Sequence, residues 1–403
     1  MKTRGLNICI VTRITSDHDF GGMQHYVDLL AEGFVKRGNK VYIITTALKD
    51  GSVFMKTESD ITTYFLENTR PGSYRRGFFK KAYLKYREID AENHIDIIHG
   101  QSASALAFCG GKVSVPVVTS LFGVGYCETP YTKLIFPKLS LVQKLKFLLK
   151  LPKIAVSMRY MYKAAFMSDK VIVISRFSER ELIRIKPELP KSRIKLIHCG
   201  IEYENFDLAN KKLLKKQLGI KGNMILSAGR IEVQKGVHTL LEAWSKLNLQ
   251  DTELIVVGDG SYLKKLRKIA RKRRLKNCRF LGSVPRKVFS DYFAAADLFV
   301  YPELTKPAFG LVAAQALAKG TPVIGSDHGA IPEVIGDAGF LFNPSDSDDL
   351  AEKIEYFFDN RESWEYLGQK AQNRVESLFS VSLMLKETLG LYFDLIKKKR
   401  RSV

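Results

Sequence analysis

The sequence predicts an α/β protein made of two doubly wound domains, each with a mostly parallel sheet. The chain has 403 residues, which exceeds the size of one ordinary domain. Short runs rich in Ile and Val alternate with amphipathic helical stretches, in two successive series. These runs are continuously apolar, which is typical of parallel strands covered on both faces.

The order of the elements places the domain boundary near residue 198. The first series of strands reads LNICIVT, KVYIITT, IDIIHG, PVVTS and KVIVIS, and it closes with IKLIHCG. The second series reads MILSAGR, ELIVVGDG, CRFLGSV, LFVYPEL and PVIGS. We therefore expect domains at 1–198 and 199–380. A closing helix should begin at 381, pack back on the first domain and end in a basic tail that reaches residue 403.

The composition is that of a soluble globular protein with a substantial core. Hydrophobic residues make up 45% and charged residues 26%, and no run approaches the roughly 20 apolar residues of a membrane span. The first apolar run, LNICIV, is too short for a secretory signal, so a cytosolic location is expected. The five cysteines show no CxxC spacing and indicate free thiols rather than disulfides or a metal site. They are Cys9, Cys109, Cys127, Cys199 and Cys278.

The net charge of +22 predicts an anionic partner. Residues 1–200 hold 32 Lys and Arg against 17 Asp and Glu, so the first half carries most of the surplus. Segments 70–87 and 129–168 combine cations with aromatic or aliphatic residues and contain no acid. This composition favours contact with an anionic membrane surface; the alternative is a helix packed on the domain with a solvated basic face. Nucleic acid is not expected, because no recognition module is visible.

An alanine-rich helix after Phe309 and Gly310 is a candidate anion site. Gly310 lets a ligand approach the backbone, and the N–H groups of Phe309, Gly310 and Leu311 lie at the positive end of the helix dipole. Gly320 suits the left-handed position that ends a helix, and Pro322 prevents continuation.

Two cations in the loop SAGRIEVQKG can converge on the same anion. Arg230 and Lys235 follow a predicted strand and are five residues apart. Each charge-assisted hydrogen bond to a diphosphate contributes roughly 1.5–3 kcal/mol. The pair Gly21 and Gly22, between the first strand and the first helix, offers a second place where phosphate oxygens can meet backbone amides.

Together these segments resemble the retaining GT-B glycosyltransferases of family 4. The matching stretches include FGGMQHYVDLLAEGFVKRGNKV, VIVISRFSEREL, SAGRIEVQKGVHTLLEAW, LIVVGDGSYLKKL and FGLVAAQALAKGTPVIGSDHGAIPEVI, and they extend over nearly the whole chain. The resemblance implies two Rossmann-like domains facing across a cleft. The N-terminal domain would bind the acceptor and the C-terminal domain the nucleotide sugar.

The resemblance also implies roles for particular residues. Arg230 and Lys235 would act in catalysis by neutralising the diphosphate leaving group, without a metal or other cofactor. The motifs DHD at 17–19 and DSD at 346–348 spell a metal-binding pattern, but we interpret the second as a helix cap. The donor site would be completed by Gly22, Gly258, Phe309, Gly310, Leu311 and Gln315.

The sequence departs from the family pattern at several polar positions. The two glutamates that usually flank the helix start align with Pro307 and Gln315, and the usual His-x-His aligns with 99–101. A further histidine of the first domain is replaced by Phe122. Either Glu303 or Lys306 fills the vacant sugar position, or the donor is a deoxy or N-acetylated hexose, or turnover has been lost. Candidate contacts to sugar or acceptor are His25, Gln101 and Glu303, although His25 and His99 also suit structural roles.

The function expected from the sequence is sugar transfer with retention of configuration. The donor would be a UDP- or GDP-sugar, and the acceptor a lipid-linked molecule or polysaccharide at the inner face of a membrane. The alternative is a non-catalytic GT-B scaffold, or a nucleotide-sugar-binding partner subunit of a glycosylation complex.

Overall fold

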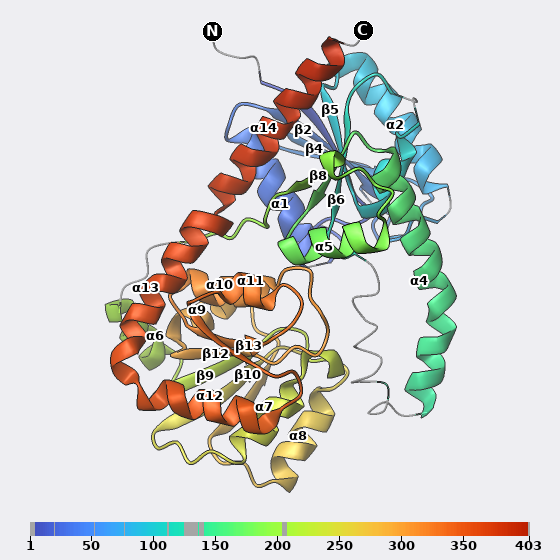
Figure 1. Ribbon diagram of the computed structural model, residues 1–403. Coiled ribbons are helices and arrows are strands. Elements are labelled where there is room, and N and C mark those ends of the chain that lie inside the picture. The colour runs from blue at the N-terminus through green and yellow to red at the C-terminus, as the bar shows by residue number, and fades with distance from the viewer. Residues whose placement is uncertain are drawn as a thin grey trace. The chain divides into compact units, whose positions relative to one another are not determined.

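The chain folds into two compact units, each built around its own sheet (Figure 1). The structure is a computed structural model, and it describes residues 5–19, 21–51, 53–75, 77–110, 113–124, 136, 141–203 and 208–401. The N-terminal unit comprises Met1–Gly125, Leu145–Gly200 and Val381–Val403, and the C-terminal unit comprises Tyr126–Lys144 and Ile201–Ser380. The predicted α/β class with two mainly parallel sheets is confirmed.

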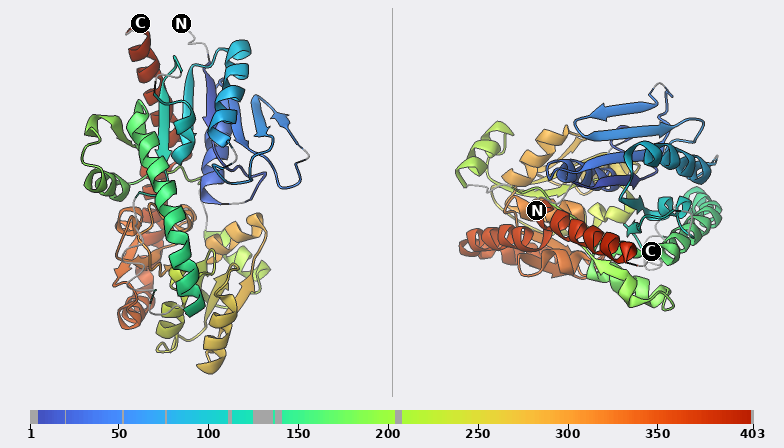
Figure 2. Two further views of the ribbon diagram at one scale, coloured as in Figure 1. Left: turned by 90° about the vertical axis from the view of Figure 1, so that its right-hand side faces the viewer. Right: turned by 90° about the horizontal axis from the view of Figure 1, so that it is seen from above.

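The N-terminal sheet has eight strands in the order β3-β4-β2-β1-β5-β6-β7-β8. All neighbours pair in parallel except β3 and β4, an antiparallel pair at the edge (Figure 2). The strands are β1 (Asn7–Val11), β2 (Lys40–Thr46), β3 (Met55–Glu58), β4 (Ile61–Leu66), β5 (Ile97–Gln101), β6 (Val117–Leu121), β7 (Lys170–Val173) and β8 (Ile194–Leu196).

Helices cover both faces of this sheet. Helix α14 packs against α1, while α2 packs against β2 and the 3₁₀ segment η1. The closing helix α14 thus belongs to the N-terminal unit. The helical elements are α1 (Gly22–Val35), α2 (Phe78–Asn93), η1 (Ser102–Ala107), α4 (Leu141–Met167), α5 (Arg176–Ile185), η3 (Lys191–Arg193) and α14 (Val381–Arg400).

The aromatic residues of segment 70–87 lie mainly in the core, which was not expected. Phe78 and Tyr86 are fully buried, and Tyr74 stacks on Phe79 with ring centroids 5.6 Å apart. Burying these rings removes large apolar areas from water and stabilises the packing of α2 on the sheet. The rings of this segment therefore have a structural role, while Arg70, Arg75, Lys80 and Arg87 are exposed, as is Leu84, at 49%.

A buried polar network joins α14 to the middle of the N-terminal sheet. Tyr392 of α14 and His99 of β5 form a hydrogen bond of 2.6 Å, and the other ring nitrogen of His99 contacts the Ser120 hydroxyl at 2.7 Å. All three side chains are buried. His99 therefore has a structural role here, and complete burial lowers the pKa of its imidazole to about 3.

His99 should make the stability of the N-terminal unit fall with acidification. Between pH 6.5 and about 3 the unfolded chain protonates this ring while the folded chain does not, so stability decreases as pH falls through that window. The slope is up to roughly 1.4 kcal/mol per pH unit. Hydrogen exchange of β1 and β5 amides should show a weaker acid dependence in His99→Gln. The exposed control His94→Asn should keep the parent slope; equal slopes in all three proteins would contradict the expectation.

The C-terminal sheet has six parallel strands in the order β11-β10-β9-β12-β13-β14. Its central strands are almost fully buried, as their continuous apolar runs predict. The strands are β9 (Asn223–Ala228), β10 (Thr252–Val257), β11 (Cys278–Gly282), β12 (Leu298–Tyr301), β13 (Val323–Ser326) and β14 (Gly339–Phe342).

Two groups of helices enclose the C-terminal sheet. Helices α7, α8 and α12 pack together over a core that includes Ile225, Val256 and Val300. Helix α10 packs with α9, α11 and α13, and α6 packs with α9. The helical elements are α6 (Leu208–Gln217), η4 (Val233–Lys235), α7 (Val237–Trp244), α8 (Leu263–Lys272), α9 (Arg286–Ala295), α10 (Leu311–Ala318), α11 (Ile331–Ile335), α12 (Ser347–Asp359), η5 (Arg361–Ser363), α13 (Trp364–Arg374) and η6 (Val375–Phe379).

Two local predictions are confirmed and one region lies outside the description. Gly320 follows α10 with φ 68°, the left-handed conformation predicted for the helix end. The cysteines Cys9, Cys109, Cys199 and Cys278 are free thiols, and the first three are buried.

Cys127 and residues 129–135 and 137–140 of the second basic segment lie outside the described residues. Among the described helices, none has the length and apolarity needed to traverse a bilayer.

Candidate functional site

The strand order of the C-terminal unit defines where a ligand should bind. Strand β9 comes first in this unit, and the chain places β10 on one side of it and β12 on the other. In open parallel sheets, ligands bind beyond the carboxyl ends of the strands at such a reversal of strand order. The loops after β9, β10 and β12 therefore form the candidate site, and they contain Arg230, Lys235, Gly258 and Gly310.

The loops after β9 and β10 are held together by close backbone contacts. Ile231 N–H donates to the Asp259 carbonyl at 2.8 Å, and Gly229 and Gly258 both have positive φ, at 134° and 129°. A Cβ atom on Gly258 would lie 1.8 Å from the Gly229 carbonyl oxygen. Arg230 projects from this turn with an exposed side chain. Glycine at 258 thus lets two loops meet at a distance that any side chain would prevent.

Gly258→Ala should lower the stability of the C-terminal unit by at least about 2 kcal/mol, because the new methyl group collides with backbone. Both tryptophans, Trp244 and Trp364, lie in this unit, so denaturant unfolding followed by tryptophan fluorescence reports it directly. Gly219→Ala is the matched control, since Gly219 also has positive φ but has no atom within 4 Å of the added carbon. It should lose only the roughly 1 kcal/mol of backbone strain; an equal loss in both variants would contradict the steric explanation.

Lys235 is anchored by a buried carboxylate from the neighbouring loop. The Lys235 ammonium group forms a short ion pair with Glu303, whose side chain is 0% exposed while that of Lys235 is 30% exposed. Glu303 also accepts from the hydroxyl groups of Tyr301, at 3.2 Å, and Thr305. An ammonium group has three N–H donors, so Lys235 keeps donors for a ligand while Glu303 fixes its position.

The same tyrosine connects Lys235 to the mouth of α10. The Lys235 nitrogen lies 6.0 Å from the centroid of the Tyr301 ring. A Cβ atom on Gly310, the N-cap residue of α10, would lie 3.5 Å from the edge of that ring. A 2.7 Å hydrogen bond from Leu304 N–H to the Gln234 carbonyl is a second contact between the loops after β12 and β9. The Lys235 ammonium group and the positive end of α10 therefore both lie near the Tyr301 ring, which makes this part of the unit the candidate anion site.

The structure places the remaining predicted donor residues around α10. Gly310 has φ 109° and Leu311 begins the helix, so both offer backbone N–H groups without an acceptor within the helix. Phe309 is buried and packs edge-to-face on Phe379, which indicates that its ring is structural. Gln315 is half-buried on the second turn of α10.

Packing also defines the surroundings of Pro307, which occupies a position where the family usually has a glutamate, and of the nearby Glu303. The Pro307 carbonyl accepts from Ala330 N–H at 3.0 Å, and a Cβ on Gly329 would touch the Pro307 ring. Glu303 is committed to protein donors, so contact with a sugar would require these hydrogen bonds to break. Lys306 is half-exposed. We therefore interpret Glu303 as a positioning residue for Lys235.

In the N-terminal unit, the predicted residues gather at a second reversal of strand order. Strand β1 lies between β2 and β5, and Gly22 begins α1 directly after the β1 loop. His25 is half-buried in the first turn of α1. Gln101 ends β5, is fully buried, and its amide has no hydrogen-bond partner among the described residues. A buried amide without partners is costly, which makes Gln101 unusual among the three predicted contacts, and in this structure its amide atoms are closed to solvent.

The two DxD patterns have different surroundings. Asp346 caps α12 by accepting from the N–H groups of Asp348 and Asp349 at 3.0 and 3.1 Å, so the predicted helix cap is confirmed. His18, between Asp17 and Asp19, contacts the Thr46 carbonyl at 3.0 Å. In the described part of the chain, no cluster of three His, Cys, Asp or Glu residues with metal-ligand geometry occurs.

The two mainly parallel-sheet α/β units, one with cationic side chains in the loops at its strand reversal, correspond to the GT-B fold of glycosyltransferases. Solved structures support this fold. Sucrose-phosphate synthase of Thermosynechococcus elongatus matches with a TM-score of 0.79 at 21% identity, covering 98% of this chain and all of that one. Anabaena HepE, solved with UDP and glucose, matches with a TM-score of 0.73 at 18% identity, covering 97% and 100%.

Sequence comparisons then identify the family. The profile for glycosyl transferases group 1 matches residues 210–374, and that for glycosyltransferase family 4 matches residues 20–205. An uncharacterized glycosyltransferase of Methanocaldococcus jannaschii is 26% identical over 96% of this chain and 98% of its own. Sulfoquinovosyl transferase of Arabidopsis thaliana is 26% identical over 70% and 53%. The chain belongs to the group 1, family 4 glycosyltransferases, a type that binds nucleotide-sugar donors and glycan acceptors.

Sequence reasoning missed the group that holds Lys235 in place. The sequence indicates Glu303 only as a sugar contact and gives no role to Tyr301. One signal was present: Glu303 follows LFVYP, a run too apolar for an exposed strand end, and a carboxylate in such surroundings usually requires a cationic partner.

Proposed function

We propose that the protein transfers a sugar from a nucleoside-diphospho-sugar, UDP- or GDP-linked, to a lipid-linked or glycan acceptor. The observations that carry this proposal are that Arg230 and Lys235 follow β9 at the strand reversal, and that Lys235 and the start of α10 both lie close to the Tyr301 ring. Retention of configuration and independence of metal ions are part of the proposal.

The chemistry of the donor explains why fixed positive charge is needed. Breaking the bond from the sugar to the diphosphate leaves charge on the departing oxygen atoms, and groups that stabilise this charge lower the barrier. Arg230 is exposed at its turn, Lys235 is held by Glu303, and the α10 dipole adds a partial positive charge. Lys235, which Glu303 positions, would act with the α10 dipole and the exposed Arg230 in the task that a divalent cation performs in other transferases, which supports a metal-independent reaction.

The Glu303 contact supports activity rather than an inert scaffold. A fully buried carboxylate is stabilised only when it is paired, and here its charge fixes the cation that faces the donor site. Such preorganisation matters for a transition state more than for simple nucleotide binding.

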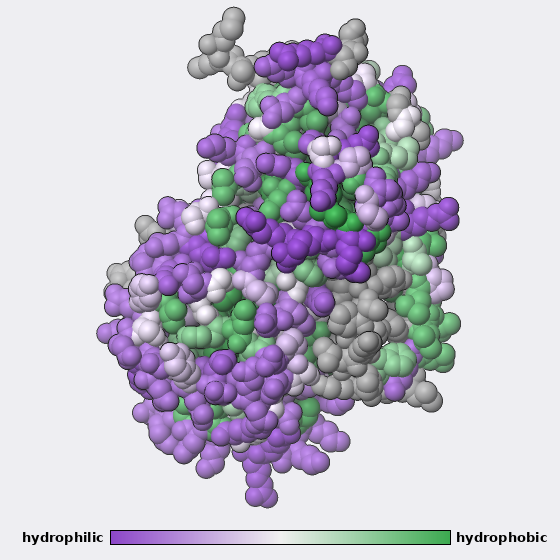
Figure 3. Space-filling view, in the orientation of Figure 1, coloured by the Kyte–Doolittle hydropathy of each residue, from purple (hydrophilic) through white to green (hydrophobic). Residues whose placement is uncertain are grey.

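The acceptor side of the proposal rests on helix α4. Exposed apolar residues follow one another at helical spacing along it, and the segment contains no acid. Figure 3 shows hydrophobic surface gathered over this helix. A phosphatidylinositol N-acetylglucosaminyltransferase subunit of Schizosaccharomyces pombe is 25% identical over 83% of this chain. We propose that α4 lies on an anionic membrane, with Leu145, Leu148, Leu149, Val156 and Tyr160 toward the lipid.

Titration and turnover together test the donor proposal. Isothermal titration of the full chain with UDP, GDP and their sugars should show saturable binding of one nucleotide series. The donor that binds should then be hydrolysed slowly without acceptor, in the presence of a metal chelator, and transferred to an extract of membrane lipids or glycans. Binding with neither hydrolysis nor transfer would instead support the non-catalytic scaffold. An absence of binding by every nucleotide would overturn the proposal.

The α4 contact predicts a specific loss of vesicle binding. Leu148→Ser/Leu149→Ser should lower partition onto anionic phospholipid vesicles at least about tenfold, because each exposed leucine contributes roughly 1 kcal/mol or more on burial in lipid. These side chains are 50% and 67% exposed, so folding should be unaffected. Flotation at low and high salt measures the effect, and Leu213→Ser, an equally exposed leucine of α6, is the control. Equal binding by both variants would contradict the role of α4.

A further inference from the structure

Helix α8 of the C-terminal unit presents a strongly basic face to solvent. No Asp or Glu occurs between Asp259 and Asp291, and the helix itself, Leu263–Lys272, carries six Lys and Arg. The residues directly after the helix extend the run to nine cations. We call these nine residues the α8 patch, and all of their side chains are exposed: Lys264, Lys265, Arg267, Lys268, Arg271, Lys272, Arg273, Arg274 and Lys276.

The cations of α8 lie on the side of the helix that faces away from the core. Leu263 and Leu266 are buried, and Ile269 packs against the core of the unit. At about 100° of rotation per residue, the six cations of the helix fall within an arc of roughly 160° on the opposite side. No apolar residue of α8 is exposed. The α8 patch is therefore an outward-facing strip of positive charge without an apolar centre.

Most of these cations are not neutralised within the unit. Arg273 pairs with Glu242 at 3.1 Å, and among the described residues none of the other eight cations has a carboxylate partner. Lys264, Lys268 and Lys272 follow one another at intervals of four residues, where like charges on a helix repel each other. The helix therefore keeps a repulsion that an external anionic surface would relieve.

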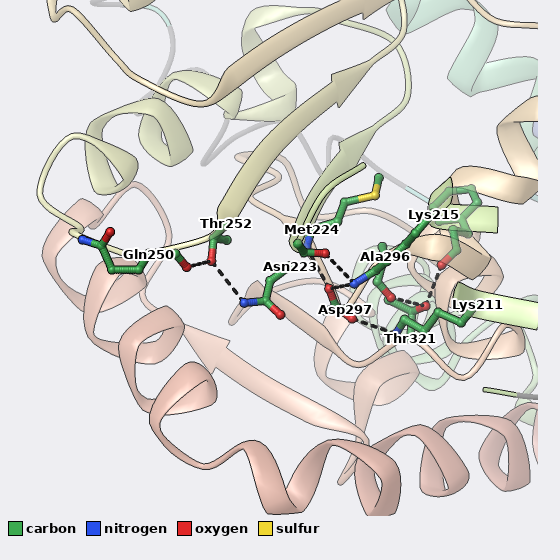
Figure 4. A network of polar contacts seen from close by, with 11 residues as sticks. Lys211, Lys215, Asn223, Met224, Gln250, Thr252, Ala296, Asp297 and Thr321 are labelled. Carbon is green, nitrogen blue, oxygen red and sulfur yellow. Dashed lines mark hydrogen bonds and ion pairs between the residues drawn. The ribbon is translucent and has the colours of Figure 1, made fainter. Parts of the chain in front are cut away.

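The other charged helices of this unit show a different arrangement. Lys211 and Lys215 of α6 both pair with the buried Asp297 carboxylate, at 3.2 and 2.5 Å (Figure 4). Helix α12, in the same group of helices as α8, carries five Asp and Glu against one Lys, and that Lys pairs with Asp349 at 3.6 Å. Charge is thus segregated in this group, acidic on α12 and basic on α8. Such segregation orients the unit toward an anionic surface.

We infer that the α8 patch binds the anionic headgroups of a membrane, as a contact additional to that of helix α4. A plane of phosphate groups can meet many cations of a convex strip at once, and clusters of Lys and Arg on an amphipathic helix are typical of binding to anionic lipids. A protein partner is disfavoured, because the centres of protein interfaces are apolar and contain little Lys. Single-stranded nucleic acid is disfavoured because α8 exposes no aromatic ring for stacking on bases.

This inference is independent of the donor site and of the α4 contact. The cations of the α8 patch belong to neither the donor loops nor α4. Donor binding in solution and membrane binding through α8 can therefore fail separately.

Flotation of the full chain with lipid vesicles tests the contact. The vesicles consist of phosphatidylcholine alone or of equal parts of phosphatidylcholine and phosphatidylglycerol. Lys264→Gln/Lys268→Gln/Lys272→Gln should lower partition onto the anionic vesicles at least about tenfold at low salt, and the difference from the parent should shrink as salt screens the contact. Glutamine has nearly the helix propensity of lysine, so α8 should remain folded. Equal partition of the parent and this variant would overturn the inference.

A triple variant with the same loss of charge is the matched control. Lys212→Gln/Lys216→Gln/Lys221→Gln removes three exposed lysines from α6 and from the segment between α6 and β9, and it should keep most of the parent's partition. Helix α6 belongs to the other group of helices, which packs around α9. Equal losses in the two triple variants would show an effect of net charge alone and would also overturn the inference.

Two further measurements separate the α8 contact from other interactions. In the Leu148→Ser/Leu149→Ser background, the α8 substitutions should remove the salt-sensitive vesicle binding that remains. Vesicle binding that persists unchanged would contradict a separate contact through α8. Binding of a random-sequence RNA that depends on α8, without vesicle binding that depends on α8, would assign the patch to nucleic acid and refute the membrane contact.

Discussion

Lys235→Met is expected to slow sugar transfer strongly and also to destabilise the C-terminal unit. Transfer should fall by about 10³, the effect of losing a preorganised charge donor at the leaving group. The stability effect arises because the substitution leaves the Glu303 carboxylate buried without its ion-pair partner. Breaking a buried pair from one side costs about 3 kcal/mol or more. A simple loss of activity in this variant therefore mixes two causes.

The double variant Lys235→Met/Glu303→Gln separates the loss of the ammonium group at the donor site from the loss of stability caused by the unpaired Glu303 carboxylate. Glutamine is neutral. Its oxygen can accept from one of the two hydroxyl groups that donate to separate oxygens of Glu303, and its amide N–H can donate to the other hydroxyl oxygen, so folding should largely recover. Activity should not recover, because the ammonium group is still missing. The single Glu303→Gln protein keeps that group and should keep measurable turnover.

The free energy of unfolding and the rate of transfer, measured for each of these proteins, distinguish the two causes. Denaturant unfolding followed by the fluorescence of Trp244 and Trp364 gives the stability of the C-terminal unit. Single-turnover transfer at saturating donor gives the chemical step. If the double variant regains both stability and turnover, Lys235 serves only to neutralise Glu303, and its catalytic role is wrong.

Arg230→Ala is expected to reduce kcat/KM by roughly 10²–10³ with little change in stability. The Arg230 side chain is exposed and follows a glycine turn, so no core contact is lost. The rate decreases because a charge-assisted donor to the diphosphate is removed, and the diphosphate gains charge in the transition state. Affinity for the free nucleoside diphosphate should fall in parallel, since this product carries the same charge.

Arg271→Ala provides the matched control for Arg230. It removes an exposed guanidinium group from α8 in the same unit, and therefore changes the net charge equally. Kinetics over a range of salt concentrations distinguish the two proteins, because a general field effect is screened by salt whereas a direct contact is screened much less. Equal losses in both variants would exclude a direct contact between Arg230 and the donor.

Much of the fold was predictable from local patterns. Continuous Ile and Val runs gave the buried parallel strands, and glycines after strands marked the turns at which Gly229 and Gly258 adopt positive φ. The limits of α10 followed from Gly310 and Gly320. The cations at 230 and 235 were predictable for the same reason, since the turn that presents them is encoded within a few residues.

The aromatic segment at 70–87 shows where local patterns mislead. Its composition suggested membrane contact, yet Phe78 and Tyr86 are core residues of the N-terminal unit. A stretch of cations and rings has the same composition whether the rings enter a bilayer or a protein interior. Only the packing of α2 on the sheet distinguishes the two environments.

By itself, the sequence determined the α/β class, the succession of the inner strands and the positions of the glycines and cations in the donor loops, but it did not reveal the strands β3, β4 and β14. Tertiary structure decided which charges meet. Glu303 holds Lys235 across 68 residues, Asp297 pairs with Lys215 across 82, and His99 meets Tyr392 across 293. Backbone conformation depends mainly on near neighbours along the chain. The energy of a charge instead depends on burial and on partners in space, which exist only after distant segments have packed together.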